Sequence, residues 1–177
     1  MERGHPARNE RLGVRKPPKD GTLNNMNLIF RQATLDDLPV IVRMLADDFL
    51  GATREDAGEP LNENYLKAFA EIDASEANEL IVVELDGKVV GTMQLTFIPG
   101  ISRLGAKRLL IEAVRVDSSL RGHGIGKKMI EWAIGRAKSA GCQSVQLTSD
   151  NARKDAHRFY ENLGFKGSHL GMKFTIS

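Results

Sequence analysis

A glycine-rich hexapeptide, RGHGIG, separates two runs of opposite character and constrains the fold more than any other part of the chain. The run before it, LLIEAVRV at residues 109–116, is short and rich in branched side chains, as is typical of a buried strand. After it, apolar residues recur at every fourth position from Ile125 to Ala137, so residues 124–140 are predicted to form an amphipathic helix that stops at Gly141. The sequence therefore predicts a strand, a glycine turn and a helix in direct succession.

The start of such a helix favours phosphate groups. Its first backbone N–H groups have no partner within the helix, and the helix dipole adds positive charge there. A P-loop needs four residues between its glycines, but only three separate Gly122 from Gly126, and the dinucleotide fingerprint needs glycine or alanine where this chain has Lys127. The pattern that remains is Arg-x-x-Gly-x-Gly, formed by Arg121, Gly124 and Gly126.

A second motif, HRFYENLGF at residues 157–165, follows a strand-like stretch at 144–149 and a helical pattern at 152–163 that Gly164 ends. The two motifs, in this order and separation, resemble the GNAT acetyltransferase superfamily. The resemblance covers the chain from residue 26 to the C-terminus. Within the superfamily, RKDAHRFY and GSHLGMKF are most similar to the branch of small-amine and aminoalkylphosphonate acetyltransferases.

The resemblance implies an α/β (α+β) GNAT fold, with a central mixed, mostly antiparallel twisted sheet of six to seven strands flanked by about four helices. The sequence pattern agrees, and the dipeptide Asp86–Gly87 predicts a tight hairpin. The predicted strands are 27–32, 80–85, 88–97, 109–116, 144–149, 165–167 and 172–176, and the predicted helices are 34–49, 62–72, 124–140 and 152–163.

Composition predicts a single folded domain with a polar extension. The chain has 177 residues, of which 41% are hydrophobic and 27% charged, as expected for one globular domain, here residues 26–177. Residues 1–25 carry six basic and three acidic side chains, three prolines and no apolar period, so they are predicted to be a disordered basic tail. The tail has no aromatic residues among its basic ones, which argues against nucleic-acid binding.

Two further features concern localisation. The chain has no run of 18 or more apolar residues and no signal-peptide pattern, so no association with a membrane is expected. A single cysteine, Cys142, excludes an intrachain disulfide framework. Together these features predict a cytoplasmic protein.

The resemblance implies an enzyme that transfers acetyl from acetyl-CoA, its co-substrate, to a primary amine of a small molecule by direct attack in a ternary complex. Two candidate catalytic residues follow from it. Glu112 stands where many relatives carry the acid that takes the amine proton, and Tyr160 stands where they carry the proposed general acid toward the thiolate. The structural alternatives are a salt-bridged carboxylate for Glu112 and a half-buried aromatic for Tyr160.

Candidate acetyl-CoA contacts fall in three places. Val114 and Val116 are expected to present backbone groups to the pantetheine arm, beside a bulge that parts their strand from the next. Near the second motif, Arg153 stands where many relatives have an asparagine that holds this arm, and Asn151 is a candidate substitute. The pyrophosphate is expected to contact the loop residues Arg121, Gly122, His123, Gly124, Ile125, Gly126 and Lys127.

The sequence does not identify the amine that accepts the acetyl group. Gln94, Thr96 and His169 are the candidate substrate-binding residues, and the same pocket is expected to draw on Asp47, Asp48 and Tyr65. Acidic side chains would favour a cationic amine, whereas Arg54, Lys107 and Arg108 would equally admit an acidic acceptor.

Two other functions stay open, namely a protein or peptide N-acetyltransferase and a non-catalytic regulatory module that binds acetyl-CoA. No metal requirement is expected, because the chain has no metal-ligand pattern. Dimers are frequent among relatives, so the resemblance also leaves a homodimer open.

Overall fold

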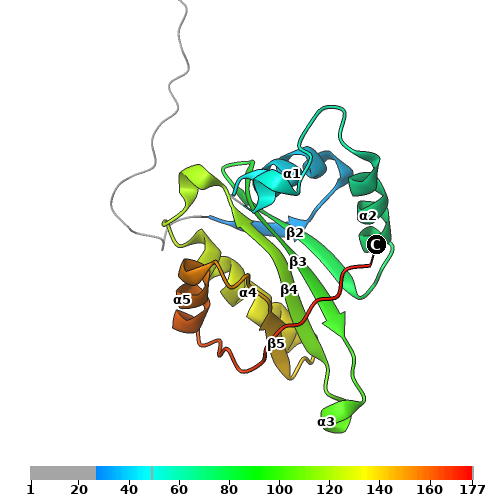
Figure 1. The fold of residues 1–177 in the computed structure, drawn as a ribbon, viewed down its shortest axis with the longest axis vertical. Coiled ribbons are helices and arrows are strands. Elements are labelled where there is room, and N and C mark those ends of the chain that lie inside the picture. The colour runs from blue at the N-terminus through cyan, green and yellow to red at the C-terminus, as the bar shows by residue number, and fades with distance from the viewer. Residues whose placement is uncertain (1–26, 49, 177) are drawn as a thin grey trace, which may run out of the picture.

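A computed structural model of the chain describes residues 27–48 and 50–176, so the predicted disordered tail at 1–25 lies outside the described residues. One twisted sheet runs through the molecule (Figure 1). Its strands are β1 (Ile29–Gln32), β2 (Asn78–Leu85), β3 (Lys88–Ile98), β4 (Arg108–Val116) and β5 (Ser144–Leu147). They lie in the order β1-β2-β3-β4-β5; all neighbours are antiparallel except β4 and β5, which are parallel.

Helices cover both faces of this sheet (Figure 1). They are α1 (Leu38–Ala46), α2 (Glu63–Asp73), α3 (Ser102–Gly105), α4 (Ile125–Ser139) and α5 (Lys154–Asn162), with 3-10 turns η2 (Leu35–Asp37), η3 (Gly51–Thr53) and η4 (Ser118–Leu120). Within the described ranges, no helix is both long and apolar enough to cross a membrane.

Alternation along β2 builds a core on each face of the sheet. Ile81 and Val83 pack into the larger core, which includes Met129 of α4, whereas Val82 between them packs with Ile41 of α1 on the other face. Because successive side chains of a strand point to opposite faces, a continuous apolar run such as LIVV suits a strand that is covered on both sides.

The predicted β2–β3 hairpin is confirmed. Asp86 and Gly87 have φ angles of 51° and 74°, the pair of positive values that a type I′ turn requires. The predicted helix over 62–72 is also present, and Asn62 caps it by accepting a hydrogen bond from the Asn64 N–H at 3.0 Å.

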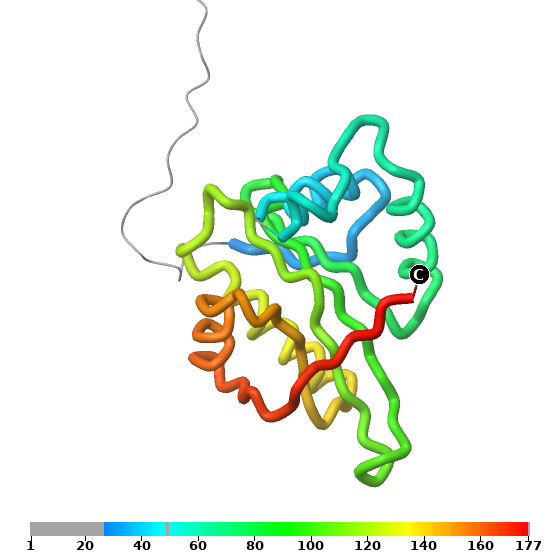
Figure 2. Tube along the Cα trace, viewed as in Figure 1, coloured from blue at the N-terminus to red at the C-terminus, as the bar shows by residue number. Residues whose placement is uncertain are grey.

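The strand count of six to seven is wrong, since the described residues form a sheet of five strands. The segments 165–167 and 172–176 are not strands, and Figure 2 traces this part of the chain as an extended run after α5. Their alternating apolar pattern is present, but a strand forms only against a partner, and none of the described strands pairs with them. The described part of the chain also forms five helices where about four were expected, and the additional one is α3, a short turn at the far end of the β3–β4 hairpin.

One irregularity of the sheet positions the site. β4 pairs with β5 only from Arg108 to Ile111, so the last residues of β4 have no partner on β5. At the same place the register between β3 and β4 shifts, and Ala113 takes a φ of 52°. A residue in this conformation marks a bulge, which bends a strand and ends its pairing. β5 ends at Leu147, opposite Ile111, so residues 112–116 of β4 have no partner on β5; this unpaired edge of β4 is called here the β4–β5 gap.

Candidate functional site

The β4–β5 gap is bordered on one side by residues 112–116 of β4. The bulge that the resemblance implied beside Val114 and Val116 is confirmed by the positive φ of Ala113 and the register shift between β3 and β4. Both valines pack against the core beneath, which fixes the backbone between them. β5 forms no ladder hydrogen bonds with this stretch, and the carbonyls of Val114 and Val116 instead accept hydrogen bonds from the Arg115 and Arg121 side chains, at 2.9 and 3.1 Å.

The glycine loop lies at the end of β4, between η4 and α4. Gly122 and Gly124 have φ angles of 83° and 74°, a region that side chains disfavour. At Gly126 a Cβ would lie 3.4 Å from the Phe159 ring, so a larger residue would crowd the packing of α4 against α5. The His123 ring folds back onto the loop, with Nδ1 3.1 Å from the Arg121 carbonyl oxygen.

This loop fits a diphosphate. The first main-chain hydrogen bond of α4 is donated by Lys128 to the Gly124 carbonyl at 3.2 Å, which leaves the N–H groups of the preceding turn without a helical acceptor. Ile125 anchors the turn in the core with 1% of its surface exposed. The loop thus presents N–H donors and the positive end of a 15-residue helix to one point.

Tyr160 of α5 belongs to an aromatic group with Phe159 and Phe165, whose ring centroids lie 5.1 Å and 5.8 Å away in edge-to-face contact. Burial raises the pKa of the Tyr160 phenol, and the charges of Arg115 and Arg153 counteract part of that rise. The phenol is therefore protonated at neutral pH, and it is close enough to β4 to interact with the Arg115 charge.

Glu112 is exposed and stands directly before the bulge. In the register of the sheet it lies opposite Gln94 of β3, so two of the predicted residues share one position along the sheet. Cβ atoms of residues paired in this way are close enough for the side chains to interact.

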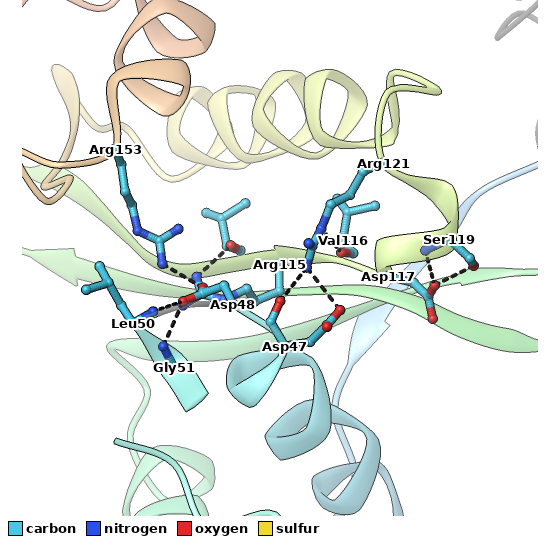
Figure 3. Close-up of polar contacts among 11 residues, drawn as sticks. Asp47, Asp48, Leu50, Gly51, Arg115, Val116, Asp117, Ser119, Arg121 and Arg153 are labelled. Carbon is cyan, nitrogen blue, oxygen red and sulfur yellow. Dashed lines mark hydrogen bonds and ion pairs between the residues drawn. The ribbon is translucent and has the colours of Figure 1, made fainter. Parts of the chain in front are cut away.

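Asp48, just beyond α1, reaches across to both sides of the gap (Figure 3). Its carboxylate accepts a hydrogen bond from Arg153 at 2.6 Å, forms an ion pair with Arg115 at 3.1 Å, and accepts the Gly51 N–H at 2.7 Å. Burial acts to raise the pKa of Asp48, but the Gly51 N–H and the two guanidiniums outweigh it and lower this pKa to about 2. Asp48 is therefore ionised at neutral pH and draws α1 toward β4 and α5.

Arg121 makes a second connection between the end of α1 and β4, next to that of Asp48 (Figure 3). Its Nε donates to the Val116 carbonyl at 3.1 Å, and its Nη2 donates to the main-chain and side-chain oxygens of Asp47 at 2.9 and 3.1 Å. Both arginines that were predicted to hold acetyl-CoA, Arg121 and Arg153, thus direct guanidinium groups toward the C-terminal end of α1.

The other predicted residues are more scattered. Asn151 is exposed in the turn before α5. Thr96 donates to the Asn78 side chain at 2.8 Å, and the ring of His169 contacts its neighbour Ser168 at 2.8 Å in the segment after α5. Lys107 donates to the Ala140 carbonyl at 3.3 Å, beside the end of β4 remote from the gap.

Arg115 is the site residue that sequence reasoning missed. The signal is present in the sequence, because the strand LLIEAVRV contains a second charged residue, Arg115, besides Glu112. A charge within an apolar strand is costly to bury unless it is paired or used.

The comparisons with known proteins agree with this geometry. Residues 41–165 match the acetyltransferase (GNAT) family. The chain is 39% identical over 65 residues to aminoalkylphosphonate N-acetyltransferase of Salmonella typhimurium, which is 37% of this chain and 41% of that protein. It is 37% identical over 90 residues to glucosamine 6-phosphate N-acetyltransferase of Trypanosoma brucei brucei, which is 51% of this chain and 59% of that protein. These matches span less than two thirds of either relative.

Solved structures match over a longer stretch. A transcriptional regulator from Bacillus halodurans C-125 is 48% identical with a TM-score of 0.82, covering 84% of this chain and 99% of that chain. Glucosamine-6-phosphate N-acetyltransferase from Arabidopsis thaliana is 25% identical with a TM-score of 0.67, covering 85% and 99%. Since the family match runs from α1 through the glycine loop to the end of the second motif, the chain belongs to the acetyltransferase (GNAT) family.

Proposed function

We propose that this protein is an acetyl-CoA-dependent N-acetyltransferase that acetylates a primary amine of a small molecule by direct attack in a ternary complex. The observation that carries the proposal is the β4–β5 gap, which opens at the Ala113 bulge and has the glycine loop at its end. One region thus combines a stretch of β4 that β5 does not pair, a glycine loop at the start of a helix and a half-buried phenol.

Acetyl-CoA supplies the activated acyl group, and the residues of the chain hold it and move protons. The N–H groups at the start of α4, with Gly122 and Gly124, would hold the pyrophosphate, and the main chain at Val114 and Val116 would hold the pantetheine arm. A main-chain N–H near Val114 would stabilise the negative charge that develops on the carbonyl oxygen.

Proton transfer falls to Glu112 and Tyr160. The carboxylate of Glu112 takes a proton from the acceptor amine, directly or through one water molecule, so that the amine can attack. Tyr160 donates its phenolic proton to the departing thiolate. Burial raises the pKa of this phenol, so the proton is present at neutral pH. No acyl-enzyme is formed in this scheme, because the amine attacks the thioester itself.

The named relatives support a small-molecule acceptor, since an aminoalkylphosphonate and glucosamine 6-phosphate are both small primary amines. One observation favours a second candidate, a regulatory module that binds acetyl-CoA without turnover: the 48% identical structure is that of a transcriptional regulator. A protein or peptide N-acetyltransferase is the third outcome that an experiment has to separate.

The test is free-thiol release from acetyl-CoA by the purified protein. The acceptors are polyamines, amino acids, aminoalkylphosphonates, aminosugars and short peptides. We expect turnover above the no-acceptor background with at least one small amine. Saturable acetyl-CoA binding without turnover would favour the regulatory module, and turnover with peptides alone would favour the protein acetyltransferase.

Single substitutions then test the proton-transfer roles proposed for Tyr160 and Glu112. Tyr160→Phe and Glu112→Gln are each expected to lower kcat by about 10²-fold or more while acetyl-CoA still binds, because a positioned acid or base contributes about 10² to 10⁴. Glu71→Gln, an exposed change on α2, is the matched control for Glu112→Gln and should leave kcat unchanged. Unaltered turnover by Tyr160→Phe would remove the acid role.

A further inference from the structure

Two arginines from different elements meet at one carboxylate beside the β4–β5 gap (Figure 3). Arg115 comes from β4 and Arg153 from the start of α5, and both pair with Asp48, at 3.1 Å and 2.6 Å. The Arg115 side chain is 14% exposed and that of Asp48 13%. This is a largely buried ionic group, which costs desolvation energy that a surface pair avoids.

Positive charge exceeds negative charge around Arg115. The charges that act on it come from Arg54 and Arg153, which are positive, and from Asp48 and Glu55, which are negative. In the ion pairs themselves, two guanidiniums, those of Arg115 and Arg153, share the single carboxylate of Asp48. A buried cation that is not fully balanced is unfavourable, and burial correspondingly lowers the pKa of Arg115.

Arg115 also has an unused donor. Its Nη1 donates to the Val114 carbonyl at 2.9 Å, and its Nη2 pairs with Asp48, but its Nε is buried and makes no hydrogen bond within the described part of the chain. Buried donors are nearly always satisfied, so an unpaired guanidinium N–H indicates a missing acceptor. An acceptor with negative charge would satisfy this donor and balance the surplus charge together.

The position of the cluster connects it to the reaction. Arg115 is two residues beyond the Ala113 bulge, in the part of β4 that β5 does not cover. Arg115 and Arg153 both act on the pKa of Tyr160, so they lie near the proposed acid. The diphosphate site is a separate feature, built from main-chain groups at the start of α4. The cluster is therefore placed to contact the acceptor.

We propose that Arg115, held by Asp48 alongside Arg153, binds an acidic group of the acceptor, so that the substrate is a primary amine that also carries an oxyanion. This rests on the proposed function and specifies its substrate class. Guanidinium groups match phosphonate, phosphate and carboxylate oxygens through paired hydrogen bonds, which an ammonium cannot reproduce. Asp48 fixes the two side chains before the substrate arrives, and so reduces the cost of ordering them on binding.

The test compares acceptors of one length that differ in charge. 2-Aminoethylphosphonate and β-alanine present two kinds of oxyanion, and propylamine presents none. For the unmodified protein we expect kcat/KM to be about 10²-fold or more higher for at least one acidic acceptor than for propylamine, the scale of a charge-assisted hydrogen-bonded pair. The oxyanion that gives the higher value identifies the group that the site prefers.

Arg115→Met should remove this preference. We expect the ratio of kcat/KM for the preferred acidic acceptor to kcat/KM for propylamine to fall about 10²-fold. Arg115→Lys should restore only part of the preference, because a lysine supplies charge without the fork. Arg158→Met, which removes an exposed guanidinium paired with Asp155, is the matched control.

Calorimetric titration of 2-aminoethylphosphonate and β-alanine into the same proteins separates the two proposals. If no amine is turned over but one of these ligands binds the unmodified protein and not Arg115→Met, the acidic site stands and the proposed function fails. If propylamine is acetylated as efficiently as the acidic amines, or if Arg115→Met lowers all three equally, the acidic site is overturned and the acetyltransferase stands. Arg153→Met provides a second variant if Arg115→Met does not fold.

Discussion

Tyr160 is a phenol whose proton is retained by burial while two guanidiniums act against that effect. The net result is a pKa above the ordinary value of a tyrosine. A group that must be protonated to act is active below its pKa and loses activity as the pH rises through it. We therefore expect kcat at saturating substrate to show no loss attributable to Tyr160 between pH 7 and about pH 10.

The measurement is kcat against pH from 7 to 10.5, with the stability of the protein checked at each pH. Arg115→Met gives a comparison, because removing a cation that favours the phenolate should move any alkaline limb to higher pH. A loss of kcat centred well below pH 10 would contradict the assignment of Tyr160 as the acid.

Gly124 and Gly135 differ in whether the backbone requires a glycine, and an alanine substitution at each position measures the difference in stability. Gly124→Ala puts a side chain at a φ of 74° and should cost about 1 to 2 kcal/mol of unfolding free energy. Gly135→Ala, inside the helix with nothing within 4 Å of its Cβ position, should add about 0.5 to 1 kcal/mol.

Urea unfolding of the two variants measures these changes, and acetyl-CoA titration of the folded proteins completes the comparison. Gly124→Ala should also weaken the binding of acetyl-CoA, because Gly124 is part of the loop that presents the N–H groups. Gly135→Ala should bind acetyl-CoA with unchanged affinity. Equal stability changes for the two would show that the backbone of the loop is not strained by a side chain.

The start of α1 is connected to two strands by one arginine. Arg31 of β1 donates to both carboxylate oxygens of Asp37, at 2.6 and 2.9 Å, and to Glu84 of β2 at 2.6 and 2.8 Å. Asp37 also accepts the N–H of Thr34 at 2.7 Å, which caps the 3-10 turn before α1. The hydrogen bond from Arg31, with those from Thr34, outweighs burial and lowers the pKa of Asp37 to about 2.

This connection predicts a pH dependence. A carboxyl whose folded pKa lies below its unfolded value stabilises the protein above the unfolded pKa, near 3.8, and loses that effect as the pH falls toward about 2. Asp37→Asn should lower the unfolding free energy at pH 7 by about 2 kcal/mol, the range for a hydrogen bond to a charged group. Urea unfolding at pH 7 and pH 3 should show a smaller difference between the two proteins at pH 3. A difference that does not change with pH would contradict the role of this carboxylate.

Local signals made most of these elements predictable. The turn Asp86–Gly87 and the glycine after the helical period at 124–140 depend on neighbouring residues alone, and both were predicted correctly. The pairing of Arg115 with Asp48 joins residues far apart in the sequence, and no local pattern specifies it. The strands at 165–167 and 172–176 were overpredicted for the same reason, because alternation indicates which face a strand would bury but does not supply a partner.

The chain after α5 gives the molecule an unusual surface. Leu170, Met172, Phe174 and Ile176 alternate with small or polar residues and are 81% to 92% exposed. Several large apolar side chains exposed within one short segment lower solubility. Replacing Met172 and Phe174 with serine should therefore raise the concentration at which the protein precipitates and leave its melting temperature within about 1 °C, since surface changes away from packed groups are nearly neutral.

Precipitation in ammonium sulfate and a thermal melt measure both quantities on the full chain. Leu95→Ala, a change at a residue with 0% exposure, is the opposite control and should lower the melting temperature strongly. A large loss of melting temperature in the double serine variant would show that these side chains are packed in the protein in solution.

The bonds from Asp47 and Asp48 also bear on how the chain folds. Arg121 and Arg153 are 74 and 105 residues away from their partners, so each bond closes a long loop of the chain. Closing such loops is entropically costly, and contacts of this length form after local ones. A nascent or partly unfolded chain can therefore possess its glycine loop and its hairpin while its reaction centre is still unassembled. On the proposed function, we therefore expect a partly folded chain to lack acetyltransferase activity until these long-range bonds have formed.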